Sequence, residues 1–238
     1  MESHNSHIRV GELLGSGRTA DVYAFEEGGA NEVNGTWVLR RYRDGGYGDA
    51  PAEAAVMEYV RRHGYPVPQV RAAVQTPTDL VMERLSGPTM LRAFHDGLVG
   101  PEETGATLAR LLHALHALPP RLSTDPAARV LHLDLHPDNV MLTPAGPRVI
   151  DWANSEEGPP GLDWGTSAVI LAQVAVGDDP LAKPAGAMLA ALLAGNTHKV
   201  TDEGLTEARR RRAANPTMSA RETEVLGDAE ELIRRLLG

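Results

Sequence analysis

The sequence predicts an α+β fold of two lobes, a small antiparallel sheet followed by a mainly helical part. A hairpin bent at Gly15-Ser16-Gly17 between apolar runs indicates the sheet near the N-terminus. Leucines at helical spacing from Glu102 to Leu118 indicate helices in the second half. Ser86-Gly87-Pro88 interrupts the chain between the predicted sheet and the predicted helices, so we expect an N-lobe over residues 1–85 and a C-lobe over residues 86–238.

The remaining N-lobe elements follow from alternation and turn residues. Alternating apolar and polar residues predict strands, Pro51 suits the first turn of a helix, and glycine-rich stretches predict turns. Val38 and Arg40 fall on the same face of one strand, because side chains alternate along a strand. We therefore expect a turn at Gly28-Gly29, a strand over 36–42, a turn over 44–48, a helix over 52–63, and strands over 70–74 and 79–83.

The C-lobe is predicted to hold two short strands among its helices. The strands lie in residues 131–142 and 148–152, with a turn at Pro144-Ala145-Gly146-Pro147 between them. Helices are expected over residues 102–118, 162–176, 181–194 and 201–213, and after a capping box formed by Ser219 and Glu222. In the helix over 201–213 the acidic residues come first and Arg209 to Arg212 come last, which suits the helix dipole better than nucleic-acid binding.

Polar side chains able to hold a proton or a metal flank these two short strands. Asp134 is able to accept the proton of an attacking hydroxyl, and Asn139 and Asp151 offer the oxygen ligands that magnesium prefers. Phosphoryl transfer needs this combination of positioning and charge neutralisation. A zinc metallohydrolase is the alternative, since His132, Asp134 and His136 at a period of two share one strand face. The positions of Asn139 and Asp151 have no explanation in a zinc site, so we favour phosphoryl transfer.

The run His-Leu-Asp-Leu-His-Pro-Asp-Asn over residues 132–139, with Asp151-Trp152 after the second strand, resembles the aminoglycoside phosphotransferase family. That family belongs to the small-molecule branch of the protein-kinase-like fold, so the resemblance implies a bilobal kinase-like fold. The implied roles are a base at Asp134, magnesium ligands at Asn139 and Asp151, and structural support from His132 and Asp163.

The same resemblance assigns the N-terminal hairpin to the nucleotide. Gly15, Ser16 and Gly17 match the glycine-rich loop that covers nucleotide phosphates with backbone N–H groups, and Val22 is expected against the adenine. The usual third glycine of the family is Ala20 here, a small residue that we expect to fit.

The resemblance also places nucleotide contacts on the following strands. The phosphate-gripping lysine of the family falls at Arg40, which we expect to pair with Glu53 of the next helix, or with Glu58 as the second choice. The backbone of Glu83 and Leu85 is expected to contact the adenine edge at the hinge between lobes.

The arginine at position 40 is the clearest departure from the family pattern. Arginine keeps the charge of lysine but is bulkier and forked, and the first lysine of the chain is Lys183. The sequence therefore allows a second hypothesis, a nucleotide-binding pseudokinase that is catalytically weak or silent.

The composition of the chain bears on disulfides, on nucleic-acid binding and on membrane association. The chain has 238 residues, no cysteine and a formal net charge of -9, which excludes disulfides and argues against general nucleic-acid binding. With neither a signal peptide nor an apolar stretch of membrane-spanning length, we expect a cytoplasmic protein without membrane partners.

The sequence predicts ATP or GTP and Mg²⁺ as cofactors and a small hydroxylated acceptor, such as an aminoglycoside or other antibiotic, an amino sugar or an amino alcohol. Glu156, Glu157, Asp202 and Glu203 could attract a cationic acceptor if they lie near the cleft. The oligomeric state does not follow from the sequence.

Overall fold

The computed structural model describes residues 9–26, 36–43, 49–71, 76–178 and 180–238. The chain divides into two compact units, Met1–Ser86 and Gly87–Gly238, which are considered separately below. The predicted turns at Gly28-Gly29 and over 44–48, and the end of the predicted strand over 70–74, lie outside the described residues. Among the described helices, none combines the length and the apolar character that crossing a bilayer requires.

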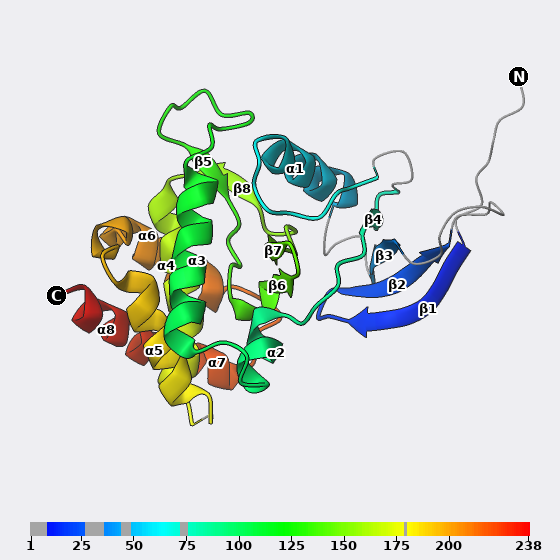
Figure 1. Cartoon of the computed structure of the whole chain (residues 1–238). Helices are drawn as coiled ribbons and strands as arrows, with labels where there is room; N and C mark the ends of the chain where they lie inside the picture. Colours follow the sequence, from blue (N-terminus) through cyan, green and yellow to red (C-terminus); the bar gives the residue numbers. More distant parts are fainter. Residues whose placement is uncertain (1–8, 27–35, 44–48, 72–75, 179) are drawn as a thin grey trace, which may run out of the picture. The chain divides into compact units, whose positions relative to one another are not determined.

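The first unit contains a four-stranded antiparallel sheet (Figure 1). Its strands are β1 (Arg9–Ser16), β2 (Ala20–Glu26), β3 (Trp37–Tyr42) and β4 (Asp79–Glu83), in that order across the sheet. The predicted glycine-bent hairpin and the predicted strands over 36–42 and 79–83 are thereby confirmed. Val70 makes only an isolated antiparallel bridge with Met82, so the predicted strand over 70–74 is at most a fragment in the described residues.

The helix predicted over 52–63 is confirmed as α1 (Ala50–Arg62). It begins where Asp49 caps it, because the carboxylate accepts the N–H of Ala52 at 3.0 Å, and Pro51 occupies the first turn. Alternation gives the sheet two different faces. One carries Arg40, and the other carries an apolar cluster made of Phe25, Leu39 and Val81, with Tyr23 and Trp37 packed against it.

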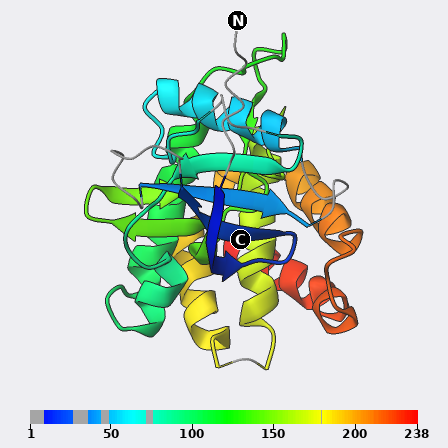
Figure 2. The ribbon, with the colours of Figure 1, turned by 90° about the vertical axis from the view of Figure 1, so that its right-hand side faces the viewer.

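The second unit is built around α4 (Pro160–Ala175), whose residues 161–173 are all buried. A helix that is apolar on every side has to be covered on every side. The covering helices are α3 (Pro101–His116), α5 (Ala182–Leu193), α6 (Asp202–Ala213) and α8 (Leu226–Leu237). Figure 2 shows α6 in orange beside α4 in yellow-green. A Cβ on Gly165 of α4 would lie only 2.9 Å from the carbonyl oxygen of Gly204 in α6. The glycine at position 165 therefore allows the two helices to approach this closely.

Two small sheets lie beside these helices in the second unit. β5 (Arg129–Leu131) pairs with β8 (Glu156–Gly158), and β6 (Val140–Thr143) pairs with β7 (Gly146–Val149). The strand β8 and the short helix α2 (Met90–His95) were not predicted from the sequence. The capping box at Ser219 is confirmed and begins α7 (Ala220–Glu224).

Candidate active site

The loop that follows β5 carries the predicted base and turns sharply just before it. Leu133 has a φ of 61°, in the left-handed region that residues with side chains rarely adopt. Asp163, at the start of α4, stabilises this turn because its carboxylate accepts the N–H of His132 at 2.9 Å and the N–H of Leu133 at 2.7 Å. The left-handed residue is thus held by two charge-assisted hydrogen bonds, and it directs the following residue, Asp134, away from the strand.

His132 is fully buried and uses both ring nitrogens inside the protein. Its Nδ1 accepts the N–H of Asp134 at 3.2 Å, so Nε2 carries the proton and donates to the carbonyl oxygen of Ile150 at 3.1 Å. The imidazole packs edge-on against Trp152, with ring centroids 4.8 Å apart. His132 therefore links the loop to the end of β7. Because both of its ring nitrogens are hydrogen-bonded to the backbone, neither is available to bind zinc, which argues against the zinc metallohydrolase. In the described part of the chain, no three His, Asp or Glu side chains gather as a metal cluster.

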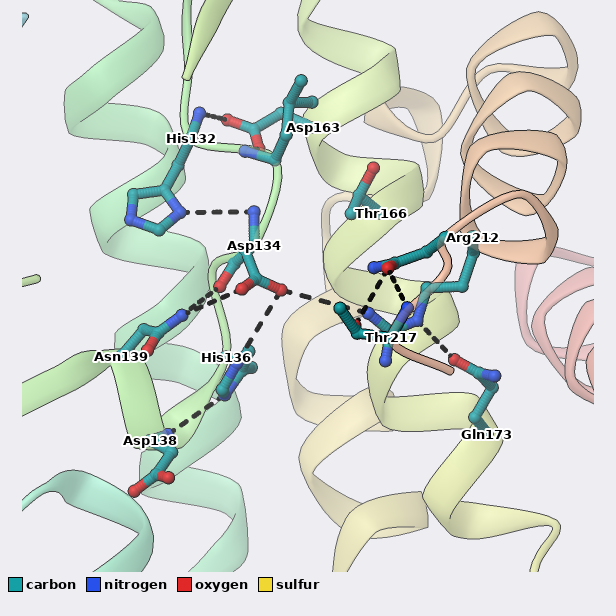
Figure 3. A network of polar contacts seen from close by, with 12 residues as sticks. His132, Asp134, His136, Asp138, Asn139, Asp163, Thr166, Gln173, Arg212 and Thr217 are labelled. Atoms are coloured by element: carbon teal, nitrogen blue, oxygen red, sulfur yellow. Dashed lines mark hydrogen bonds and ion pairs between the residues drawn. The ribbon is translucent and has the colours of Figure 1, made fainter. Parts of the chain in front are cut away.

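Asp134 and Asn139 are brought into direct contact. The Nδ2 of Asn139 donates to the carbonyl oxygen of Asp134 at 2.9 Å and to its Oδ2 at 3.3 Å (Figure 3). Asn139 is buried, at 8% exposure, whereas the Asp134 side chain is 24% exposed and remains accessible. Because the amide nitrogen of Asn139 faces Asp134, its Oδ1 points away from that contact (Figure 3).

Asp151 reaches the same region through the β6–β7 hairpin. Val140 pairs with Val149, and the N–H of Ile150 donates to the carbonyl oxygen of Asn139 at 3.0 Å. Asn139 and Asp151 thus stand just before and just after the paired strands, at one end of the hairpin. Asp151 has a φ of 63°, and it and Leu133 are the only non-glycine residues with positive φ in the described chain. Strained backbone therefore occurs in both predicted catalytic segments, a pattern typical of functional sites.

His136, for which the sequence suggested no role beyond the zinc alternative, lies beside the base. Its Nδ1 accepts the N–H of Asp138 at 3.3 Å, and its Nε2 lies 3.8 Å from Oδ1 of Asp134. Burial lowers the pKa of His136, and the carboxylates of Asp134 and Asp138 only partly offset that effect. The ring is therefore neutral near pH 7 and caps the short turn Pro137–Asn139 that carries Asn139.

His116 of α3 is a site residue that sequence reasoning missed. Its Nε2 lies 2.9 Å from Oδ2 of Asp163, and both side chains are buried, at 8% and 0% exposure. Burial raises the pKa of Asp163, but the hydrogen bond from His116 and those from the loop backbone outweigh it and leave the pKa below its ordinary value. The two residues are 47 positions apart, so no local spacing could have indicated the contact.

In the first unit, Arg40 and Glu53 form a buried ion pair. The Nη1 of Arg40 lies 2.5 Å from Oε1 of Glu53, with side-chain exposures of 7% and 2%. Tyr42, two residues along the same strand face, completes the cluster: its hydroxyl donates to Oε2 of Glu53 at 2.5 Å and accepts from Arg40 at 3.1 Å. Glu58 instead pairs with Arg62 on the surface, at 3.9 Å. Tyr42 is a further participant that the sequence analysis missed.

We expect Tyr42→Phe to lower the free energy of unfolding by roughly 1–3 kcal/mol, because it removes a hydroxyl that donates to a buried carboxylate. Denaturant unfolding followed by tryptophan fluorescence measures this change. Tyr23→Phe is the matched control, since Tyr23 lies on the opposite face of the sheet against the apolar cluster. Equal destabilisation by the two substitutions would argue against the cluster.

Ser16 of the glycine hairpin contacts Asp21, at the start of β2, and Arg43, which follows β3. The hydroxyl of Ser16 donates to Oδ1 of Asp21 at 2.5 Å, and Arg43 contacts both Asp21 and Ser16. The hydrogen bonds from Arg43 and Ser16 lower the pKa of Asp21 to about 2. Gly15 faces open space, with no heavy atom within 4 Å of where a Cβ would stand. Its lack of a side chain is therefore not required by packing, which fits a loop that approaches a ligand.

The other predicted nucleotide contacts are placed as follows. Gly15, Val22 and Arg40 are successive partners across β1, β2 and β3, so they form one row on one face of the sheet. The N–H of Gly17 donates to the carbonyl oxygen of Ala20 at 2.8 Å and closes the turn of the hairpin. Glu83 ends β4, where its N–H donates to Gln69 at 2.8 Å, and Leu85 follows as a half-buried residue.

Comparison with known proteins extends these observations. A sequence profile of the "Phosphotransferase enzyme family" matches residues 10–129 and 88–202, most of the chain. No curated protein sequence gives a significant match.

Several solved structures share the fold. A Ralstonia eutropha protein described provisionally as an aminoglycoside phosphotransferase is 15% identical, with 99% of this chain and 94% of that one covered and a TM-score of 0.56. A thermostable mutant of aminoglycoside phosphotransferase APH(4)-Ia is 14% identical, with 97% and 94% covered and a TM-score of 0.56. The streptomycin–ATP complex of APH(2'')-IIa is 15% identical, with 87% and 84% covered and a TM-score of 0.55. The kinase-like fold of this chain is thus confirmed.

Proposed function

The chain belongs to the phosphotransferase enzyme family, and on that premise we propose that it moves the terminal phosphoryl group of ATP or GTP to a hydroxyl of a small molecule. The observation that carries the proposal is the direct contact between Asp134 and Asn139 in a loop whose backbone Asp163 anchors, with Asp151 at the adjoining end of the β6–β7 hairpin.

Asp134 is the proposed base. Its carboxylate takes the proton of the acceptor hydroxyl while the acceptor oxygen forms a bond to the terminal phosphorus. The bond from that phosphorus to the bridging oxygen breaks, and the nucleoside diphosphate leaves with the electron pair. Asn139 keeps Asp134 in place through its Nδ2, and its burial fixes that geometry.

Magnesium is the proposed metal, because the amide oxygen of Asn139 and the carboxylate of Asp151 are hard oxygen donors at one hairpin end. When bound, the ion supplies charge neutralisation for the phosphates. Support for nucleotide use comes from similar folds, since APH(2'')-IIa was solved with ATP and APH(2'')-Ib with ADP.

In the first unit, the row formed by Gly15, Val22 and Arg40 is the proposed nucleotide platform. Arg40 takes the place of the lysine expected from the family resemblance, and the ion pair with Glu53 holds its guanidinium on that face. Arg43 brings a second positive charge next to Ser16.

The burial of Arg40 also favours the second candidate, a pseudokinase. The guanidinium donates to Glu53 and Tyr42, and Arg40 is only 6% exposed. In the pseudokinase, this guanidinium serves the fold of the sheet rather than the phosphates.

Nucleotide affinity and acceptor-dependent turnover, measured in wild type and in Arg40→Lys, distinguish the active phosphotransferase from the pseudokinase. We expect the wild type to turn over and Arg40→Lys to lose roughly tenfold or more in kcat/KM, since lysine lacks the fork that reaches both partners. Nucleotide binding without turnover in the wild type, together with activity gained in Arg40→Lys, would instead establish the pseudokinase.

A further inference from the structure

The four arginines that end α6 do not share one environment. Arg212 is the exception, because the other three point to the surface, with side chains 40–68% exposed. Those three are held by carboxylates: Arg209 by Glu230 at 3.1 Å, Arg210 by Glu207 at 2.7 Å, and Arg211 by Glu156 and Glu207 at 2.8 Å each. The helix dipole and surface pairs therefore account for three of the four, whereas Arg212 is directed toward the loop that carries Asp134.

Arg212 faces the proposed base. Its side chain is 18% exposed, and its Nη1 lies 4.0 Å from Oδ1 of Asp134. Its Nε donates to Oε1 of Gln173 at 2.7 Å, and the buried Gln173 donates in turn to the carbonyl oxygen of Glu222 at 2.7 Å. Figure 3 shows this chain of contacts leading from α4 through Arg212 to Asp134. The guanidinium is thus positioned by Gln173 of α4, which is itself held by the backbone of Glu222 in α7.

The close approach of α6 to α4 keeps that position fixed. Gly165 of α4 contacts Gly204 of α6 too tightly to admit a Cβ, and the N-terminus of α6 is capped by Thr201. A helix held this closely presents its last turn at a defined place, and Arg212 occupies that turn. A charge that is fixed before the substrate binds can select among substrates.

The acidic residues expected to attract a cationic acceptor have other contacts. Glu156 pairs with Arg211 at 2.8 Å, and Asp202 pairs with Arg234 at 2.6 Å. Glu157 accepts the backbone N–H groups of residues 121–123. Glu203 is exposed, on the first turn of α6, far along the helix from Arg212. The charged side chain that lies within 4.0 Å of Asp134 in the described part of this unit is therefore Arg212, and a cation there disfavours an ammonium group next to the reacting hydroxyl.

We propose that Arg212 is a specificity-determining residue and that the acceptor carries a carboxylate close to the hydroxyl that is phosphorylated. This inference rests on the proposed function. Guanidinium groups bind carboxylates through paired hydrogen bonds. Arg212 and Asp134 lie 4.0 Å apart, close enough for one compact hydroxycarboxylate to contact both, its hydroxyl at Asp134 and its carboxylate at Arg212.

The test compares three matched acceptor classes: small hydroxycarboxylates, their neutral hydroxyamides, and amino alcohols together with aminoglycosides. Wild type is expected to prefer the hydroxycarboxylates. Arg212→Gln should raise the acceptor KM for hydroxycarboxylates by roughly 10- to 100-fold, the loss of a charge-assisted pair, while the KM for nucleotide stays unchanged. Arg212→Lys should recover part of that loss.

Arg210→Gln is the control, because it removes the same charge from the same helix at a side chain that is 68% exposed. We expect its kinetics to equal those of wild type. A wild type that phosphorylates amines or aminoglycosides and spares hydroxycarboxylates overturns the inference while the proposed function stands. An equal loss for all acceptor classes in Arg212→Gln also overturns it, since that result indicates a structural role. A wild type that phosphorylates no acceptor overturns both.

Discussion

Replacing Asp134 by asparagine is expected to lower turnover by roughly two to four orders of magnitude, the usual contribution of a positioned general base. The amide keeps the shape of the carboxylate but cannot take the proton of the acceptor hydroxyl. Nucleotide affinity should stay nearly intact, because in this proposal the base contacts the acceptor rather than the phosphates. Steady-state kinetics and an independent nucleotide-binding titration measure the two quantities.

Asp138→Asn is the matched control for this prediction. Asp138 lies in the same loop and is exposed, and its carboxylate accepts from the hydroxyl of Thr89 at 2.8 Å. Its substitution makes the same chemical change four residues from the base, so turnover should remain within a few-fold of wild type. A fully active Asp134→Asn enzyme would remove Asp134 from the mechanism.

Asp163→Asn is expected to lower the free energy of unfolding by roughly 1–3 kcal/mol, the usual result of leaving buried donors without their acceptor. The carboxylate accepts from the N–H groups of His132 and Leu133 and from His116, and it is fully buried. An amide presents an N–H toward groups that themselves donate, so at least one contact is lost. Turnover should fall as well, because the left-handed turn at Leu133 directs Asp134.

The pH dependence of stability should follow from the lowered pKa of Asp163. A carboxyl whose pKa is lower in the folded protein stabilises the fold above the ordinary aspartate pKa, and loses that contribution as the pH falls through its folded value. The stability difference between wild type and Asp163→Asn should therefore shrink in acid.

Asp178→Asn serves as the control, since that side chain is 94% exposed and its ion pair with Arg221 lies on the surface. It should change the free energy of unfolding by about 0–1 kcal/mol. A destabilisation by Asp163→Asn no larger than this would contradict the anchoring role.

The fold was predictable because its signals are local. Glycines bend the β1–β2 hairpin, alternation makes β3 and β4, and leucine spacing makes α3, each within a short window of sequence. The helix α2 and the strand β8 were missed because each is short, at six and three residues, and β8 exists only through its pairing with β5. Such an element depends on tertiary contacts rather than on its own residues.

The residues of the candidate site also divide into those that local spacing predicted and those that depend on distant partners. Asp134 and Asn139 lie five positions apart, so their spacing in the sequence already suggested a shared role. His116, Tyr42 and Arg212 act through partners that are 47, 11 and 78 positions away, and no period connects them. Arg212 was also concealed by its neighbours, because a basic run at a helix C-terminus has an ordinary explanation in the dipole.

The most direct test of the account follows a labelled terminal phosphoryl group from nucleotide to product. Wild-type protein with Mg²⁺, labelled ATP or GTP and the acceptor panel is expected to yield a phosphorylated acceptor in equal amount to nucleoside diphosphate, with the label on the acceptor oxygen. Bound nucleotide that transfers no label to any hydroxyl, or releases it only as inorganic phosphate, would contradict the claim that Asp134, Asn139 and Asp151 form a phosphotransferase site.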